Sequence, residues 1–336
     1  MRIILKYLII LTIFITSSYF IAGFYVAYQI LKIDHSCGLH EGSLPNNWST
    51  SIDAHQYKNL SQRVLRENFP SKNYFLKDWQ DVYFVSRDKD IKLNGWLFNF
   101  FPNRPIIIVT HGINPNGKCK SEANLVASLL VNKNFNVLTI DLRNYGQSDR
   151  VTSFEDLGLR SYQDILGAFD FLKKIGFSNS QIGLHGISLG ASTSIFAAFH
   201  EPEISAIWSD SSLAEFNMIL KDEIARYGLS IEFGPAVSFA GKILTGIDPT
   251  LLSPALKLSK TQSYFFTHGD SDKRVLTKHF DYFQEFSLKN KINSEFWLVK
   301  ESDHLDGMLK YSDEYSKKME VGVVHSLIYL LTIIQG

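Results

Sequence analysis

The stretch Gly186-Ile187-Ser188-Leu189-Gly190 decides the fold of this chain, because it sets a serine between two glycines. The apolar run Gln181–His185 precedes it, and the alanine-rich run Ala191–Ala198 follows it. A serine on a sharp strand-to-helix turn has strained backbone angles, so the residues two positions away on either side must be small. The turn exposes the hydroxyl, and the first N–H groups of the helix face any negative charge that develops there. The pattern alone is common, but this strand-then-helix context predicts that Ser188 is a nucleophile.

Strand-like and helix-like segments alternate from about residue 80 onward. The run Pro105–Thr110 is continuously apolar and β-branched, which is typical of a strand buried on both faces of a parallel sheet. Alternation of this kind predicts parallel strands joined by right-handed crossovers. The expected strands cover residues 81–86, 91–100, 105–110, 136–141, 182–185, 204–209, 263–267 and 296–299, and the expected helices cover 121–132, 162–175 and 311–334.

The alternation is interrupted between residues 211 and 258 by a segment with aromatic side chains and glycines. Two interpretations remain open for this insertion. It is either a lid over a pocket or a pair of helices packed at the edge of the sheet.

Polar residues that follow strands are the candidates for a site, because ligands of open α/β sheets bind beyond the carboxyl ends of the strands. His304 follows the last strand, on a loop that lets its imidazole approach Ser188. A buried carboxylate must orient that imidazole and stabilise its cation. We expect Asp272 to do so, with Asp270 as the alternative and Asp210 as a third choice; a turn-stabilising role for either of the first two also stays open. The order serine, aspartate, histidine is the chain order expected of this architecture.

A negative oxygen that forms during acyl transfer needs two N–H donors. The backbone N–H of Ile113 is one candidate and that of Leu189, directly after the nucleophile, is the other. His111 and Gly112 form the supporting loop, and we expect His111 to shape that loop rather than to act as a base.

Four separate motifs make the chain resemble the α/β-hydrolases, in the style of their prolyl-oligopeptidase-like and carboxylesterase-like branch. The resemblance runs from about residue 80 to the end of the chain. It implies an α/β fold with a mostly parallel eight-stranded sheet, helices on both faces, a Ser-His-Asp site, and no metal or cofactor. The motifs are the elbow around Ser188, the HG loop (His111, Gly112), D-x-R-x-x-G-x-S (Asp141, Arg143, Gly146, Ser148) and HG-x-x-D (His268, Gly269, Asp272).

Two residues depart from the pattern of the relatives. Asn144 and Asp303 stand where relatives often have glycine, and Asn144 is able to take left-handed geometry. Within the same loop, we expect Asp141 and Arg143 to form an ion pair that fixes the loop.

The N-terminus carries a long uncharged segment. Tyr7–Leu31 is 25 residues long and lies between Lys6 and Lys32. As a helix it measures about 37 Å, enough to cross a hydrocarbon core of about 30 Å with some tilt. A signal peptide has an apolar region of only about 7–15 residues, so we expect an uncleaved signal anchor, with a cleaved signal peptide as the alternative. The charges flanking the segment favour a cytoplasmic N-terminus and an extracytoplasmic domain, by a margin of about one charge.

The expected organisation is therefore an anchor (1–32), a connector and lead-in (33–78) and a hydrolase domain (79–336). The formal net charge is zero, so no basic field indicates nucleic-acid binding. Cys37 and Cys119 are predicted either to pair in an oxidising compartment or to be free thiols. Neither has metal-ligand neighbours in the sequence, so no metal site is expected.

The sequence thus predicts a membrane-anchored serine hydrolase that acts on an ester, thioester or amide of a small-molecule or lipid-like acyl substrate. A serine peptidase and a lipid acyl hydrolase are alternatives. A non-catalytic, hydrolase-like binding module at the membrane is the alternative from another class. The sequence does not determine the oligomeric state.

Overall fold

A sheet of eight strands forms the centre of the molecule in the computed structural model, which describes residues 2–33, 42–52, 54–88, 90–113 and 119–320. The strand order is β3-β4-β6-β5-β7-β8-β9-β10. β4 runs antiparallel to both of its neighbours, and the other neighbours pair in parallel. The fold class expected from the sequence is confirmed. The strands are β3 (Gln80–Val85), β4 (Lys92–Phe98), β5 (Ile106–Thr110), β6 (Asn136–Ile140), β7 (Ile182–Ile187), β8 (Ala206–Asp210), β9 (Ser263–Gly269) and β10 (Asn293–Val299).

β5 shows why a continuous apolar run becomes a central strand. Successive side chains of a strand point to opposite faces of the sheet. Ile106 and Ile108 therefore enter the core on one face, whereas Ile107 and Val109 enter the core on the other. All four side chains are buried, because helices cover both faces.

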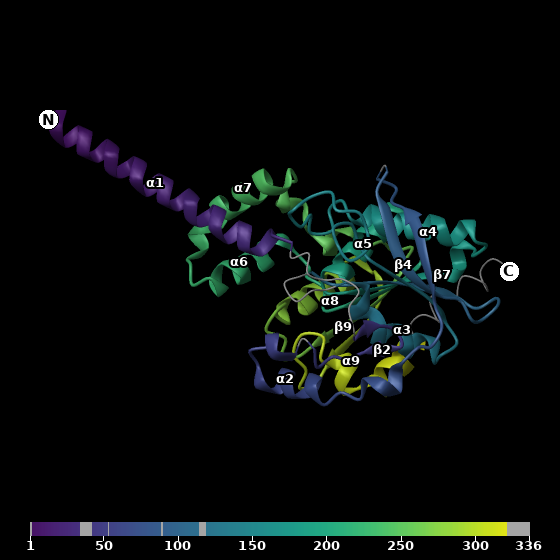
Figure 1. The fold of residues 1–336 in the computed structure, drawn as a ribbon. Coiled ribbons are helices and arrows are strands. Elements are labelled where there is room, and N and C mark those ends of the chain that lie inside the picture. Colours follow the sequence, from purple (N-terminus) through teal and green to yellow (C-terminus); the bar gives the residue numbers. More distant parts are fainter. Residues whose placement is uncertain (1, 34–41, 53, 89, 114–118, 321–336) are drawn as a thin grey trace.

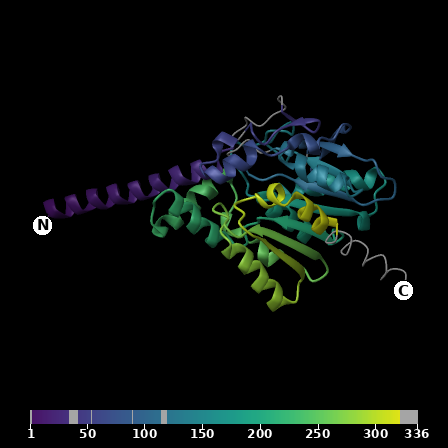
Figure 2. The ribbon, with the colours of Figure 1, turned by 90° about the horizontal axis from the view of Figure 1, so that it is seen from below.

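The helices form a layer on each side of the sheet (Figures 1 and 2). The core on one face takes side chains from α4, α5 and α8, and the core on the other face takes them from α3 and the C-terminal helical segment. The expected helix 121–132 begins as a 3-10 turn, and residues 321–334 of the expected last helix lie outside the described residues. These elements are α3 (Asn124–Val131), α4 (Tyr162–Lys174), α5 (Leu189–His200), α8 (Lys278–Asn290), α9 (Gly307–Lys310) and the helical residues 312–320.

The described part of the lead-in, residues 42–79, lies over the α3 side of the sheet. Trp48 and Leu76 join the core on that face. Besides two short strands, β1 (Ser43–Leu44) and β2 (Asn47–Trp48), this segment contains α2 (Leu60–Glu67). Asn59 caps α2, because its side chain accepts a hydrogen bond from the N–H of Ser61.

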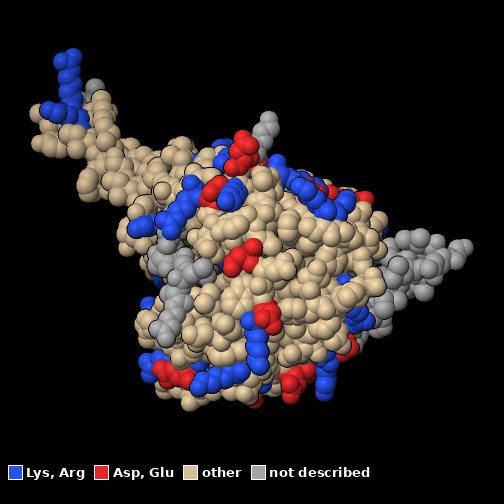
Figure 3. All heavy atoms as spheres, turned by 45° about the vertical axis from the view of Figure 1, so that its right-hand side comes forward, with Lys and Arg blue, Asp and Glu red and all other residues tan. Residues whose placement is uncertain are grey.

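The N-terminal helix α1 (Arg2–Leu31) projects away from the domain (Figure 1). Its length and apolar composition are sufficient to cross a membrane, and most of it is exposed. Figure 3 shows this projection as mostly tan spheres with blue ones near its tip, in agreement with a sequence that has its charges, Arg2 and Lys6, at the start of α1.

The insertion at 211–258 is a helix pair, α6 (Phe216–Arg226) and α7 (Gly234–Thr245), that packs beside the inner end of α1 (Figure 1). A Cβ on Gly23 of α1 would lie 2.6 Å from the Cβ of Ala236, so the glycine permits a close approach of α1 and α7. The insertion therefore packs against α1 rather than only against the sheet.

Candidate active site

Ser188 lies on the turn between β7 and α5, with φ 54° and ψ −116°. Its N–H donates a hydrogen bond of 2.8 Å to the carbonyl of Asp210 on β8. A Cβ on Gly186 would come within 2.3 Å of the Cα of Ala191, and one on Gly190 within 2.3 Å of the His111 carbonyl oxygen. The two glycines are thus required because α5 approaches β7 and the HG loop closely, as the elbow pattern predicts.

The structure brings Ser188, His304 and Asp272 together. The Nε2 atom of His304 lies 3.0 Å from the Ser188 hydroxyl oxygen, and its Nδ1 lies 2.7 Å from Oδ2 of Asp272. The Asp272 side chain is fully buried, whereas that of His304 remains 15% exposed. A hydroxyl, an imidazole and a carboxylate therefore form one hydrogen-bonded chain, which is closed to solvent at its carboxylate end and partly open at the imidazole.

The Asp272 carboxylate is held in its charged form. Burial by itself would raise the pKa of Asp272, but the charge and hydrogen bond of His304 outweigh it, so the pKa lies below its usual value. Its other oxygen accepts hydrogen bonds from the N–H groups of Arg274 (2.7 Å) and Val275 (2.8 Å). These bonds fix the carboxylate and leave Oδ2 directed at the imidazole.

His268 of the HG-x-x-D motif supports the same loop. Its Nε2 lies 2.7 Å from the Val275 carbonyl and 3.3 Å from Oδ2 of Asp272. Burial lowers the pKa of His268, so its ring stays neutral and holds the loop by hydrogen bonding.

The other two carboxylates considered from the sequence have other partners. Asp270 accepts a hydrogen bond from the hydroxyl of Ser271. Asp210 accepts a bond of 2.6 Å from the hydroxyl of Tyr315 and one of 2.9 Å from that of Ser211. Burial raises the pKa of Asp210 to about 6. Neither carboxylate takes the place beside His304 that Asp272 occupies.

The HG loop lies against the nucleophile. A Cβ on Gly112 would meet the Cβ of Ser188 at 3.1 Å, and the Gly112 N–H donates to Oε2 of Glu122 at 2.7 Å. Among the described residues, the N–H groups of Ile113 and Leu189 donate no hydrogen bond to the protein. Their part as oxyanion donors stays a prediction, and residues 114–118, which continue the loop, lie outside the described residues.

His111 organises this loop through both ring nitrogens. Its Nδ1 lies 2.8 Å from the Gly112 carbonyl, and its Nε2 accepts the N–H of Leu142 at 3.2 Å. Burial lowers the pKa of His111, which keeps the ring neutral. The supporting part of His111 stays a prediction.

The expected ion pair between Asp141 and Arg143 is wrong, because each side chain pairs elsewhere. Asp141 binds Lys120, with 2.5 Å between Nζ and Oδ2, and Arg143 binds Asp164 of α4 at 2.7 Å. Both pairs are buried and tie the loop after β6 to segments on either side of the sheet. Asn144 does adopt left-handed geometry, with φ 72°.

Sequence reasoning assigned no part to Asp303, which joins three segments around the site. Its Oδ1 accepts the N–H groups of Lys273 (2.9 Å) and His304 (2.8 Å), and its Oδ2 accepts the Asn59 side chain at 3.0 Å. The departure from glycine at this position was the one signal in the sequence that pointed to it.

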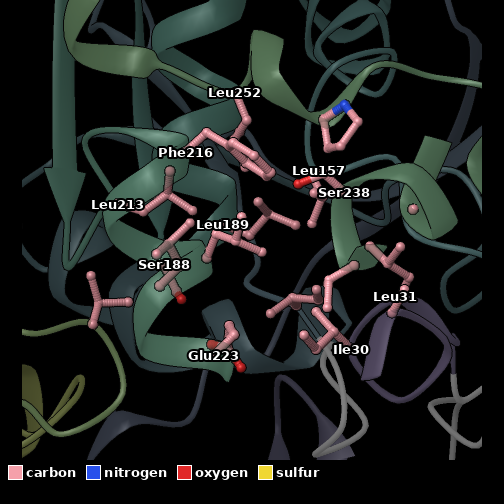
Figure 4. A pocket seen from close by; sticks show the side chains of 18 of the residues that line it. Ile30, Leu31, Leu157, Ser188, Leu189, Leu213, Phe216, Glu223, Ser238 and Leu252 are labelled. Atoms are coloured by element: carbon pink, nitrogen blue, oxygen red, sulfur yellow. The ribbon is translucent and has the colours of Figure 1, made fainter. Parts of the chain in front are cut away.

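Two pockets of different character meet at Ser188. One is a narrow slot of about 100 Å³ with an almost wholly apolar lining, which leads from Ser188 to Ile30 and Leu31 of α1 (Figure 4). The other is an open cleft of about 670 Å³ with a mixed lining, in which charged side chains of both signs take part: Lys58, Lys273, Glu122 and Asp303. A substrate at Ser188 therefore meets an apolar surface on one side and a surface of mixed polarity on the other.

Solved structures at low sequence identity share this fold. An esterase of Pyrococcus furiosus, Pf2001, is 19% identical and aligns with 76% of this chain and 93% of its own, with a TM-score of 0.57. The acylaminoacyl peptidase of Pyrococcus horikoshii is 18% identical, with 75% of this chain and 42% of its own aligned and a TM-score of 0.57.

A sequence relative is the thiohydrolase aneE of Aspergillus aculeatus, 31% identical over 141 residues, which are 41% of this chain and 43% of that protein. The match thus spans less than half the length of this curated relative. The profile of the prolyl oligopeptidase family matches residues 121–321, which contain Ser188, Asp272 and His304. Because this match covers more than half of the chain, the protein is a hydrolase with the α/β-hydrolase fold and belongs to the prolyl oligopeptidase family.

Proposed function

We propose that this protein is a serine hydrolase that cleaves an ester, thioester or amide through an acyl-enzyme on Ser188. The observation that carries the proposal is the hydrogen-bonded chain Ser188–His304–Asp272 on a strained elbow. As Ser188 Oγ attacks the acyl carbon, His304 Nε2 takes its proton. The imidazolium that forms donates from Nδ1 to Asp272, and the proton on Nε2 then passes to the leaving group.

Deacylation repeats the same steps with water. His304 Nε2 removes a proton from the water, the hydroxide oxygen bonds to the acyl carbon, and Ser188 leaves with the proton returned by His304. In both tetrahedral intermediates the oxyanion accepts the free N–H groups of Ile113 and Leu189. Loss of one donor of this kind typically costs about 2.7–4 kcal/mol.

The two pockets support a division of the substrate at the scissile bond. The narrow apolar slot suits the acyl group, and the open cleft suits the leaving group. The names of the similar proteins, a thiohydrolase, an esterase and an acylaminoacyl peptidase, share chemistry at an acyl carbon and differ in the leaving group. The acyl group is therefore the part of the substrate that this chemistry has in common, and substrate specificity is best tested on that side.

We further propose that α1 anchors the protein in a membrane with its domain on the extracytoplasmic side. Cys119 is disulfide-bonded, whereas Cys37 lies outside the described residues. Disulfides persist in oxidising compartments, which agrees with the orientation favoured by the charges that flank α1. Protease added to intact cells or spheroplasts should digest the domain, and full protection of the domain until lysis would reverse the orientation.

Labelling with a fluorophosphonate tests the nucleophile. The full-length chain in detergent micelles should label, and Ser188→Ala should not. Ser192→Ala is the matched control, because Ser192 is buried one turn further along α5 and its hydroxyl bonds to Ser212 instead. Equal labelling of the Ser188→Ala chain would reject the assignment, and an unlabelled wild type that hydrolyses no p-nitrophenyl ester would favour a binding module.

A further inference from the structure

The anchor helix forms one wall of the slot at Ser188. Ala27, Ile30 and Leu31 of α1 line it together with Phe216 and Leu220 of α6. Figure 4 shows Phe216 across the slot from Ile30 and Leu31. Val26, Ala27 and Leu31 are buried in a cluster shared with Val237 and Ala240 of α7. The slot therefore lies at the junction of the domain and the helix proposed to cross the bilayer.

The length of α1 sets the depth of this junction. A helix needs about 20 apolar residues to cross the hydrocarbon core. Counted from Tyr7, after the last charge of the N-terminal flank, such a span ends at Val26. The part of α1 that contacts the insertion begins earlier, because the Tyr19 hydroxyl donates to the Glu232 carbonyl at 2.8 Å and the Phe20 ring lies 5.6 Å from that of Phe239. A spanning α1 thus places α7 at the depth of the acyl chains.

Part of the outer surface of α7 is apolar, whereas Lys242, which pairs with Asp248, and Glu232 just before the helix are exposed and charged. Phe239 and Ile243, one helical turn apart, are 50% and 59% exposed. On α1, the rings of Phe20 and Phe24 lie beside that of Phe239. Elsewhere on the same helix, Ile21 and Tyr25 are 68% and 59% exposed. In water these side chains would form a costly apolar surface, whereas in a bilayer they face lipid.

We propose that the acyl group of the substrate is the chain of a membrane lipid, which enters from the bilayer at the end of the slot lined by α1 and α6 and reaches Ser188. The proposal rests on the hydrolase function proposed above and names its substrate class. The polar head of the lipid occupies the open cleft, among the lysines Lys58 and Lys273 and the carboxylates Glu122 and Asp303. The anchor then has two roles, because it holds the enzyme at the membrane and forms one wall around the acyl chain.

The first experiment fills the slot from the anchor side. Full-length protein is placed in phosphatidylcholine vesicles with p-nitrophenyl palmitate or acetate. Ala27→Phe should lower kcat/KM for palmitate at least tenfold and change the value for acetate less than twofold. Gln29→Phe, on the exposed side of α1, is the matched control and should behave as wild type. Gly241→Leu provides a second slot variant from α7, because a Cβ there meets only Leu31 and Pro249 at 3.5–3.8 Å.

The outcomes separate the two proposals. If Ser188→Ala abolishes hydrolysis but both slot variants lose the two esters equally, or lose neither, the lipid proposal is overturned and the hydrolase remains. If Ser188→Ala hydrolyses acetate as wild type does, the hydrolase assignment itself fails. Thermal unfolding of each slot variant at the wild-type Tm shows that the domain is folded.

The second experiment measures the depth of α7. Phe239→Trp in vesicles that carry brominated acyl chains should add fluorescence that the bromines quench. Ile175→Trp, just beyond the far end of α4, should add fluorescence that they do not quench. If the bromines quench the two added tryptophans to the same extent, the route through the bilayer is overturned.

Discussion

Asp303 accepts the backbone N–H of Lys273 at 2.9 Å, and so ties the loop that carries Asp272 to the loop that carries His304. The same carboxylate oxygen accepts the N–H of His304 itself. The separation of the imidazole and the Asp272 carboxylate therefore depends on a residue that touches neither the hydroxyl nor the acyl carbon. Asp303 is a positioning residue.

Asp303→Asn should lower kcat about tenfold on p-nitrophenyl acetate and leave KM unchanged. In this variant the side-chain oxygen still accepts the N–H groups of Lys273 and His304. Its NH₂ group, however, faces the NH₂ of Asn59, which in the wild type donates to Asp303 at 3.0 Å. Loss of a hydrogen bond to a charged group costs about 1.5–3 kcal/mol. If part of that cost raises the activation barrier, it is enough to explain the tenfold fall in kcat.

Exchange of the two residues gives the control. In Asn59→Asp/Asp303→Asn, a carboxylate at 59 accepts the amide at 303 and still caps α2, since aspartate is as good an N-cap as asparagine. We expect the double variant to recover kcat to within about threefold of wild type. No recovery would show that the charge of Asp303, and not its hydrogen-bond pattern, sets the activity.

The elbow glycines give a steric prediction. Gly190→Ala should slow fluorophosphonate labelling at least about 100-fold, because its Cβ would press on the carbonyls of His111 and Thr110, at 2.3 and 2.4 Å, and move the HG loop away from Ser188. Gly234→Ala on α7 is the matched control, since its Cβ meets nothing closer than 3.7 Å. The control should label at the wild-type rate. An unchanged rate for Gly190→Ala would show that the HG loop moves without any effect on the reaction of Ser188.

Much of this fold could be predicted because its signals are local. The β-branched run at 106–110 and the elbow at 186–190 each fix the backbone of their own neighbourhood, and the structure has both where they were expected. The order of the three candidate site residues follows from that architecture. Their mutual distances were not predictable, but parallel strands bring the loops that follow them to one edge of the sheet.

The partners of Asp141 and Arg143 could not be predicted, because charge pairs across a fold depend on elements distant in sequence. Asp164 lies on α4 and Lys120 before α3, and neither position has a local pattern that marks it as a partner. The contribution of α1 to the slot was hidden for another reason. A helix that is apolar on all sides has no stripe to show which side contacts protein.

The buried pair of Lys120 and Asp141 leads to a stability prediction. Asp141→Asn should destabilise the protein by about 3–5 kcal/mol, because it leaves the Lys120 ammonium buried, 2% exposed, without its counter-charge. Glu203→Gln is the control, since its pair with Lys173 is 39% and 47% exposed and should contribute at most about 1 kcal/mol. Thermal unfolding of the full chain in micelles measures both, and similar shifts in Tm would contradict the distinction.

His279 provides a prediction for acid. Burial lowers the pKa of His279 from 6.5 to about 4, and its Nδ1 accepts the N–H of Ala214 at 3.0 Å, with Asp222 3.7 Å from Nε2. Between pH 6.5 and 4 the unfolded chain therefore binds a proton that the folded chain does not, so stability falls as the pH falls through this window. This difference between the unfolded and folded pKa of His279 lowers the free energy of unfolding at pH 4 by about 3 kcal/mol relative to neutral pH.

His279→Asn removes the titrating ring but keeps an acceptor oxygen for Ala214. We expect the drop in Tm between pH 7 and pH 4 to be smaller in this variant than in wild type, even if its Tm at pH 7 is lower. His55→Asn, at an exposed position, should keep the wild-type drop. An identical pH dependence in the His279→Asn chain would mean that other groups account for the acid sensitivity, with His185, whose pKa burial lowers to about 3, the next to replace.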